Sequence, residues 1–182
     1  MGACMSTEAA RRKVIVVGLE GAGKSSLALV VERPGAFAKA PATIPSGQVS
    51  VVNREYRGLR FTFWDLGGGA PLRPYWRHHF VGAQAVVFVV DASAPDMLDE
   101  AREALRACAT DDQLSWPPFC VLVNKADAPG AMALSDVTAA LEVDEILGES
   151  RQWTAISTST ATDPPKGIQQ CMDWLVENTK PL

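Results

Sequence analysis

The most constraining feature of this chain is a glycine-rich segment after a short apolar run, Gly18-Leu19-Glu20-Gly21-Ala22-Gly23-Lys24-Ser25. Residues 14–17 are apolar and rich in β-branched side chains, as in a buried strand, and a helical pattern opens at Lys24. Between a strand and a helix, such glycines let successive backbone amides point at a phosphate, and the helix N-terminus adds positive potential. The sequence therefore predicts a phosphate-binding loop with contact residues Glu20, Gly21, Ala22, Gly23, Lys24, Ser25 and Ser26.

Two polar side chains of this loop and one distant carboxylate have the chemistry of a magnesium–phosphate site. The ammonium group of Lys24 can neutralise the β- and γ-phosphates, and the Ser25 hydroxyl can ligate Mg²⁺. Asp65 ends another predicted strand and is followed by Leu66-Gly67-Gly68. There the carboxylate can hold Mg²⁺ through a water molecule, and the amide of Gly68 can approach a γ-phosphate closely.

A second motif, Asn124-Lys125-Ala126-Asp127, predicts which base is bound. It follows the apolar run 119–123, so we expect it at the same edge of the sheet as the phosphate-binding loop. The Asp127 carboxylate can accept hydrogen bonds from the ring and exocyclic N–H groups of guanine, whereas adenine has no ring N–H at that place. Lys125 can lay its aliphatic stem over the base, and Asn124 can tie the base loop to the phosphate loop. The pattern favours GTP and GDP over adenine nucleotides.

The alternation of apolar runs and helical patterns predicts a single α/β domain. Residues 14–17, 85–90 and 119–123 are apolar throughout, as expected of parallel strands covered on both faces. Residues 49–52 and 59–64 predict a hairpin with one antiparallel edge strand, and a sixth strand is expected at 153–157. Helices are predicted from residue 24 and over 72–80, 95–109, 135–147 and 164–178, with Pro95 and Pro165 at helix starts. The predicted fold is that of a P-loop NTPase: a six-stranded, mostly parallel sheet with helices on both faces and the ligand at the carboxyl ends of the strands.

Composition excludes several other classes of protein. With 182 residues, 47% of them hydrophobic, the chain can bury one core, and no apolar run approaches the roughly 20 residues of a membrane-spanning helix. The net charge of −4 gives no reason to expect nucleic-acid binding. The 4 cysteines are scattered without metal-ligand spacing, which indicates a reducing cytosol. We expect a monomer with one domain over residues 13–182 and an N-terminal extension over residues 1–12.

Over essentially its whole length the sequence resembles the Arf and Arf-like family of Ras-type small GTPases. Besides the motifs above, the match includes Pro41-Ala42-Thr43-Ile44, Trp64-Asp65-Leu66-Gly67-Gly68, Arg73-Pro74-Tyr75-Trp76-Arg77-His78-His79-Phe80 and Asp173-Trp174-Leu175. The Arg-Pro-x-Trp-Arg-His pattern is specific to this family. The resemblance implies a switch protein that binds GTP and GDP with Mg²⁺, hydrolyses GTP and recruits effectors in vesicle trafficking. Effectors would bind through residues 41–48 and 65–80, and an exchange factor and a GTPase-activating protein would control the cycle.

The resemblance also implies roles for individual residues. Thr43 would ligate Mg²⁺ and sense the γ-phosphate, and Gly68 would donate its backbone amide to that phosphate. With Lys24 these residues would form the catalytic group. Ser159 and Thr160, in the loop after the sixth predicted strand, would contact the base.

One position departs from the family pattern where the catalytic group is expected. The family follows Asp-x-Gly-Gly with a glutamine that orients the attacking water, whereas this chain has Gly69. Because positioning supplies most of the catalysis in phosphoryl transfer, we expect slow GTP hydrolysis that depends on a partner. Two alternatives stay open: a GTP-holding scaffold with negligible turnover, and an adenine-dependent kinase or ATPase. Asp127 and the absence of a substrate domain disfavour the second.

The first six residues, Met1-Gly2-Ala3-Cys4-Met5-Ser6, fit the N-myristoylation pattern once Met1 is removed. Gly2 would carry the lipid. One myristoyl chain gives only marginal membrane binding, so a second signal is needed, and palmitoylated Cys4 or the basic run 11–13 could supply it. We therefore expect a cytoplasmic protein that attaches peripherally to intracellular membranes.

Overall fold

The structure, a computed structural model, describes residues 11–32 and 49–179. Its strands are β1 (Arg11–Val17), β2 (Ser50–Tyr56), β3 (Leu59–Asp65), β4 (Ala85–Asp91), β5 (Phe119–Asn124) and β6 (Trp153–Ser157). Its α-helices are α1 (Lys24–Glu32), α2 (Leu98–Ala109), α3 (Leu134–Ala140), α4 (Val143–Leu147) and α5 (Ile168–Asn178). Three short 3₁₀ helices are η1 (Arg73–His79), η2 (Pro95–Met97) and η3 (Asp112–Leu114). The predicted α/β alternation is confirmed.

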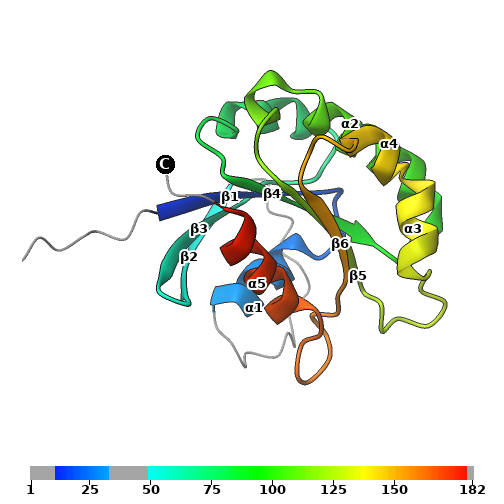
Figure 1. Ribbon diagram of the computed structural model, residues 1–182. Coiled ribbons are helices and arrows are strands. Elements are labelled where there is room, and N and C mark those ends of the chain that lie inside the picture. The colour runs from blue at the N-terminus through cyan, green and yellow to red at the C-terminus, as the bar shows by residue number, and fades with distance from the viewer. Residues whose placement is uncertain (1–10, 33–48, 180–182) are drawn as a thin grey trace, which may run out of the picture.

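The strands form one sheet in the order β2-β3-β1-β4-β5-β6. β1 pairs in parallel with β3 and β4, and parallel pairing continues through β5 to β6, whereas β2 pairs antiparallel with β3. β2 and β6 are the two edges of this twisted sheet (Figure 1). The prediction of six mostly parallel strands with one antiparallel edge strand is therefore confirmed.

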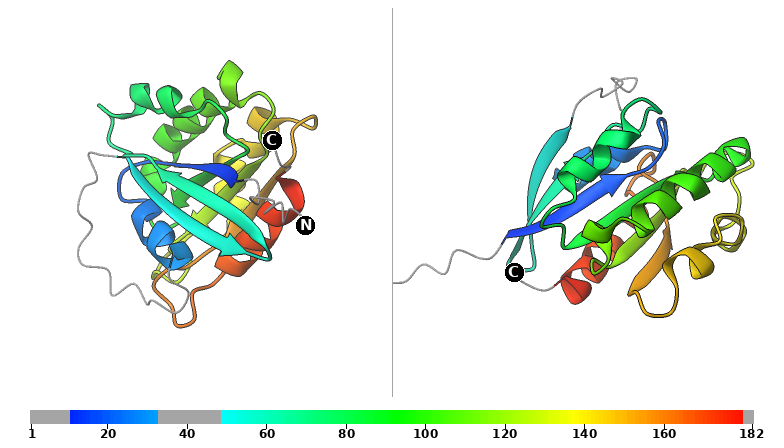
Figure 2. Two further views of the ribbon diagram at one scale, coloured as in Figure 1. Left: turned by 90° about the vertical axis from the view of Figure 1, so that its left-hand side faces the viewer. Right: turned by 90° about the horizontal axis from the view of Figure 1, so that it is seen from above.

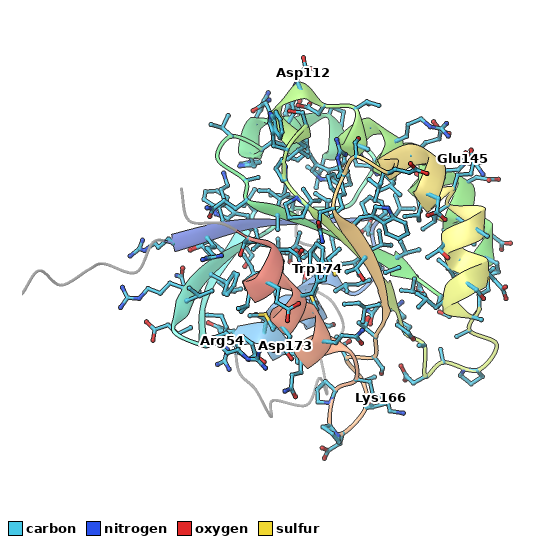
Figure 3. The ribbon with its side chains drawn as sticks, viewed as in Figure 1. Arg54, Asp112, Glu145, Lys166, Asp173 and Trp174 are labelled. Atoms are coloured by element: carbon cyan, nitrogen blue, oxygen red, sulfur yellow. The ribbon has the colours of Figure 1, made fainter. Side chains whose placement is uncertain are left out.

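Alternate residues of the central strands supply two cores, one on each face of the sheet. Ile15 and Phe88 pack into the core with α2, α3 and α4, whereas Val14 and Leu122 pack into the core with α1 and α5. Figure 2 shows these helices on the two sides of the sheet. In Figure 3 the labelled charged residues Asp112, Glu145 and Lys166 point away from both cores. Because both faces are covered, β4 and β5 are buried along almost their whole length.

The hairpin of β2 and β3 turns through Arg57 and Gly58, whose φ angles are +48° and +76°. Two successive positive φ angles match the right-handed twist of an antiparallel pair. The end of the hairpin contacts α5: the Tyr56 hydroxyl donates to Asp173 at 2.6 Å, and the Arg57 guanidinium lies 3.0 Å from the same carboxylate. The hairpin is thus attached to the last helix through one acidic side chain.

The segment predicted as one helix over 135–147 is two helices, α3 and α4, so that prediction is wrong. Glu142 stands between them with a φ of +51°, a left-handed conformation that an α-helix cannot contain. Its carboxylate accepts a hydrogen bond from Arg106 at 2.8 Å and lies 3.7 Å from Arg102, both in α2. These contacts with another helix accompany the break, and the local sequence does not encode them.

The last helix was predicted from residue 164 but begins at Ile168. Pro165 therefore precedes the helix and does not open it. Gly167 has a φ of +74°, and a β-carbon there would lie 2.3 Å from the carbonyl oxygen of Ser157, the last residue of β6. The close approach of the chain to β6 delays the start of α5 until after this glycine.

The other predicted helices are present with different local geometry. The helix over 95–109 begins at Pro95 as η2 and continues as α2, and the helix over 72–80 is the 3₁₀ helix η1. Within residues 11–32 and 49–179, no helix combines the length and the apolar composition that crossing a bilayer requires.

Replacing Phe88 with alanine should lower the free energy of unfolding by about 3–5 kcal/mol, because its ring is fully buried in β4 and its loss leaves a cavity. Urea unfolding with GDP and Mg²⁺ held constant measures the change. Val81→Ala, at a position 70% exposed, is the control and should change stability by less than about 0.5 kcal/mol. Equal stabilities of the two variants would contradict the assignment of Phe88 to the core.

Candidate functional site

The loops that carry the predicted nucleotide-binding residues follow the carboxyl ends of parallel strands. The loop after β1 leads into α1, the segment after β3 leads into η1, and the loops after β5 and β6 follow the two strands beyond β4. Open α/β sheets bind their ligands at this edge. The topology therefore brings the loops that begin at residues 18, 66, 125 and 158 to the same end of the molecule.

Close packing at two positions of the loop between β1 and α1 leaves room only for glycine. Gly18 has a φ of +143°, and a β-carbon on it would lie 2.2 Å from the carbonyl oxygen of Val89. Gly23 has a φ of +97°, and its β-carbon would lie 2.2 Å from the side-chain nitrogen of Asn124. Both the φ angles and the contacts exclude larger residues. The predicted phosphate loop is thus packed between β4 and the end of β5.

Lys24 begins α1 and is buried, with its ammonium group folded back over the loop. The group donates a hydrogen bond to the carbonyl oxygen of Leu19 at 2.8 Å. Burial lowers the pKa of Lys24, while attraction by the carboxylates of Asp65 and Glu20 opposes this change. An anion such as a phosphate would stabilise the charged form of so desolvated a group.

Ser25 and Asp65 lie side by side and fit a magnesium site. The Ser25 hydroxyl donates to Oδ2 of Asp65 at 2.8 Å. Oδ1 of the same carboxylate is buried and has no hydrogen-bond partner among the described residues. Burial raises the pKa of Asp65, and the Ser25 hydrogen bond and the Lys24 charge act in the opposite direction. Mg²⁺ takes few protein oxygens and completes its shell with water and phosphates, so this pair suits it.

The segment after β3 is fixed directly against the phosphate loop. A β-carbon on Gly68 would lie 2.3 Å from the carbonyl oxygen of Gly18 and 2.5 Å from the Lys24 ammonium nitrogen, so this position also admits only glycine. The Arg73 side chain donates to the Gly68 carbonyl at 3.0 Å, and the buried Trp76 indole donates to the Gly67 carbonyl at 2.8 Å. Two side chains of η1 therefore hold the two glycines in place.

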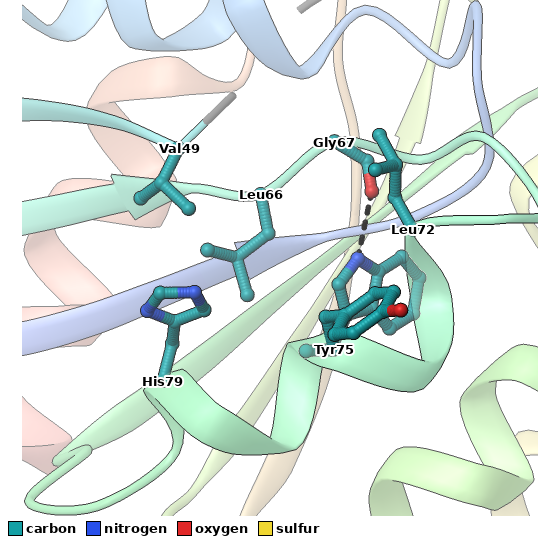
Figure 4. Close-up of a pocket in the computed structure, with 7 residues that line it drawn as sticks. Val49, Leu66, Gly67, Leu72, Tyr75 and His79 are labelled. Carbon is teal, nitrogen blue, oxygen red and sulfur yellow. Dashed lines mark hydrogen bonds between the residues drawn. The ribbon is translucent and has the colours of Figure 1, made fainter. Parts of the chain in front are cut away.

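A hollow opens beside this segment, between the start of β2 and η1 (Figure 4). Its volume is about 230 Å³, and its lining is mostly apolar: Val49, Leu66, Gly67, Leu72, Tyr75, Trp76 and His79. The indole–carbonyl hydrogen bond between Trp76 and Gly67 is at its wall (Figure 4). The hollow falls largely within the range 65–80 that was predicted to meet effectors.

The side chain of Asn124 joins the phosphate loop to the loops expected to hold the base. It is buried, and its amide nitrogen donates to the carbonyl oxygen of Ala22 at 2.9 Å. Its amide oxygen accepts from the Thr158 hydroxyl at 3.2 Å. The Ala126 amide in turn donates to the Thr158 carbonyl at 3.1 Å. The predicted tie between the base loop and the phosphate loop is present.

Lys125 and Asp127 differ in how they are held. Lys125 has a φ of +61°, and its ammonium group lies 2.6 Å from Asp91 at the end of β4. The Ser93 amide and hydroxyl both donate to that aspartate. Burial opposes ionisation of Asp91, but the Lys125 hydrogen bond, together with those from Ser93, lowers its pKa. Asp127 is exposed, so its carboxylate is free to meet a ligand. The loop therefore holds the Lys125 ammonium group in an ion pair and leaves the Asp127 carboxylate exposed to solvent.

Ser159 and Thr160 lie in the loop after β6, where the sequence placed them. Both are buried, and Ser159 exchanges two backbone hydrogen bonds with Lys166, at 2.9 and 3.2 Å. Ala126, in the loop after β5, is hydrogen-bonded to the residue that precedes Ser159. The two loops predicted to contact the base are therefore neighbours.

Three predicted features lie outside the described residues: Thr43, the range 41–48, and the acylation sites Gly2 and Cys4. Conversely, the structure adds Asp91, Arg73 and Thr158 to the site. Asp91 could have been found from its position, because it ends an apolar strand run just as Asp65 and Asn124 do. Arg73 opens the family-specific Arg-Pro-x-Trp-Arg-His pattern, although the pattern did not indicate its contact with Gly68, and Thr158 gave no signal in the sequence.

Replacing Asn124 with alanine should speed GDP dissociation by about tenfold or more, because it removes two hydrogen bonds and leaves buried polar partners unpaired. Release of a fluorescent GDP analogue with excess Mg²⁺ measures the rate. Asn178→Ala removes an amide whose hydrogen bond to Trp174 lies within α5, and it should release GDP at the parental rate. Equal rates for the two variants would show that Asn124 does not link the loops functionally.

Comparisons with known proteins identify the family of this chain. The sequence model of the ADP-ribosylation factor family matches residues 3–179. ADP-ribosylation factor 3 of Arabidopsis thaliana is 34% identical over 168 residues, which are 92% of this chain and 88% of that protein. ADP-ribosylation factor-like protein 1 of Saccharomyces cerevisiae is 30% identical, with 92% of this chain and 87% of the relative covered.

Among solved structures, the Arl6 BBS3 small GTPase from Trypanosoma brucei with a bound nucleotide analogue, GppNp, has a similar fold. The TM-score is 0.81 at 22% identity, over 92% of this chain and 96% of that one. The fold, the match to the family model and the two relatives agree, and we conclude that this chain belongs to the ADP-ribosylation factor family of small GTPases.

Proposed function

We propose that this protein switches between GTP- and GDP-bound states at the loops described above, with Mg²⁺ as cofactor. Members of the ADP-ribosylation factor family are GTP-binding switch proteins, and this chain is one of them. The observation that carries the proposal is the buried Asn124 side chain, which joins the phosphate loop to the base loop beside Asp127. That link supports a phosphate cradle and a guanine-selecting carboxylate at one edge of the sheet.

Each part of the nucleotide has a proposed set of contacts. Residues 20–26 surround the phosphates, and the base meets Asn124, Lys125, Asp127, Ser159 and Thr160. Mg²⁺ is held by Ser25 and Thr43 directly and by Asp65 through water. Lys24, Thr43 and the amide of Gly68 stabilise the γ-phosphate during hydrolysis. The contacts among Lys24, Ser25, Asp65 and Gly68 support this assignment.

We propose slow intrinsic hydrolysis of GTP because Gly69 has no side chain to orient the attacking water. The fold does not demand glycine here: a β-carbon on Gly69 would meet only Glu20 at 3.5 Å and Pro71 at 3.9 Å, which are ordinary contacts. Packing of the fold therefore does not explain why the chain has glycine at this position. It also favours the second candidate function, a GTP-holding scaffold with negligible turnover.

The output of the switch is proposed to be effector binding through residues 41–48 and 65–80. An exchange factor and a GTPase-activating protein would set the nucleotide state. Acylation of Gly2, with Cys4 as a second site, would hold the protein on intracellular membranes, where it would act in vesicle trafficking. The apolar hollow at η1 supports the placement of one effector surface.

Asp127→Asn should reverse the base preference. The amide nitrogen of the new asparagine is a hydrogen-bond donor, and it would face the N–H donors of guanine. GDP affinity should therefore fall about 100-fold or more. Xanthosine diphosphate carries a carbonyl in place of the exocyclic amine and should bind the variant better than GDP does. Competition binding measures both affinities. The exposed acid Asp136, replaced with asparagine, is the control. Unchanged GDP affinity in Asp127→Asn would contradict guanine selection by this carboxylate.

Gly69→Gln should hydrolyse GTP about tenfold faster or more than the parent protein, because the amide can orient water. Single-turnover hydrolysis of GTP with saturating Mg²⁺ measures the rate. Gly69→Ala adds a β-carbon without an amide and should stay at the parental rate. A glutamine variant no faster than the parent, with or without an activating protein, would show that Gly69 does not limit hydrolysis.

A further inference from the structure

The side chain that comes closest to the place of the missing glutamine is that of Glu20. A β-carbon on Gly69 would lie 3.5 Å from Oε2 of Glu20, nearer than any other described atom outside its chain neighbours. A glutamine at this position would start from that β-carbon. The Glu20 carboxylate thus stands at van der Waals distance from where such a side chain would begin.

Glu20 reaches this place from the phosphate loop itself. It lies between Gly18 and Gly21, and its side chain is exposed to solvent. Its charge attracts the ammonium group of Lys24 and opposes the lowering of the Lys24 pKa by burial. A β-carbon on Gly68 would lie 2.5 Å from that ammonium nitrogen. The carboxylate, the ammonium group and the Gly68 backbone therefore converge on the end of the loop that would face a γ-phosphate.

We propose that the Glu20 carboxylate orients the attacking water in this protein, the task for which Gly69 has no side chain. The inference rests on the proposed GTPase function and deepens it. A carboxylate is a strong acceptor and can hold a water molecule by accepting one of its O–H groups. Glu20 is exposed and therefore accessible to water without any rearrangement of the core.

The chemical step needs no further reactant. The water oxygen forms a bond to the γ-phosphorus as the bond from that phosphorus to the β,γ-bridging oxygen breaks, and the bonding electron pair leaves with GDP. The proton of the water passes to an oxygen of the released phosphate. Glu20 accepts a hydrogen bond throughout and takes up no proton.

The same charge has an opposite effect on binding. A carboxylate near the γ-phosphate repels it, whereas GDP has no phosphate at that place. Because the group is exposed and screened, this repulsion should be weak, about two- to fivefold in affinity. Loss of Glu20 should therefore slow hydrolysis and yet strengthen binding of a GTP analogue relative to GDP. A purely structural role for Glu20 would weaken both.

The test compares the parent protein with Glu20→Ala, Gly69→Gln and the double variant. Single-turnover GTP hydrolysis and the affinities for GDP and a non-hydrolysable GTP analogue are measured on all four, with Mg²⁺. Glu20→Ala should hydrolyse GTP about tenfold more slowly than the parent. In the Gly69→Gln background the same replacement should change the rate less than about twofold, because the glutamine takes over the water. Glu177→Ala, which removes an exposed acid from α5, is the charge-matched control.

The results separate this inference from the proposed function. Glu20→Ala could hydrolyse GTP at the parental rate, or it could slow hydrolysis equally in the parent and in the Gly69→Gln variant. Either result refutes the role of Glu20 while GTP binding stands. A parent with no turnover beside an active Gly69→Gln variant also refutes the role of Glu20 and favours the scaffold. A parent that binds neither GTP nor GDP would refute the proposed function and this inference together.

Discussion

The site depends on one buried amide group that ties together segments far apart in the sequence. Asn124 donates to the phosphate loop and accepts from the loop after β6, so its two hydrogen bonds connect three of the loops at the carboxyl edge of the sheet. A buried amide without these partners would carry a desolvation cost. The loops around it are therefore stable chiefly in the arrangement that places phosphate and base contacts together. The parallel sheet brings the loops to one edge, and the Asn124 side chain orients them relative to one another.

The phosphate loop is in direct backbone contact with the segment after β3. Gly68 packs on Gly18 and the Lys24 ammonium group with no room for a β-carbon. Movement of the Lys24 ammonium group toward a phosphate would change the surroundings of Gly68. Arg73 and Trp76 in η1 donate hydrogen bonds to the carbonyls of Gly68 and Gly67, so the same movement would reach η1. The nucleotide end of the molecule and the apolar hollow at η1 are thus joined by a short chain of contacts.

Much of this arrangement could be predicted from sequence because its signals are local. Residues 14–17 of β1, 85–90 of β4 and 119–123 of β5 are continuous apolar runs, and the loop from Gly18 carries its glycines at fixed spacing. What could not be predicted depends on contacts between distant segments. The break at Glu142 coincides with contacts to arginines of α2, and the late start of α5 coincides with the close approach of Gly167 to β6. The proximity of Glu20 to Gly69 has the same origin, because no sequence pattern relates positions 20 and 69.

The attachment of the β2–β3 hairpin to α5 has a consequence for the whole molecule. Tyr56 and Arg57 share the Asp173 carboxylate, and both belong to the end of the hairpin farthest from the nucleotide loops. A one-residue slip of β2 along β3 would turn every β2 side chain to the opposite face and withdraw Tyr56 from its partner. The Asp173 carboxylate on α5 therefore opposes a change in the register of β2 on β3. Moving the hairpin would break both of these contacts.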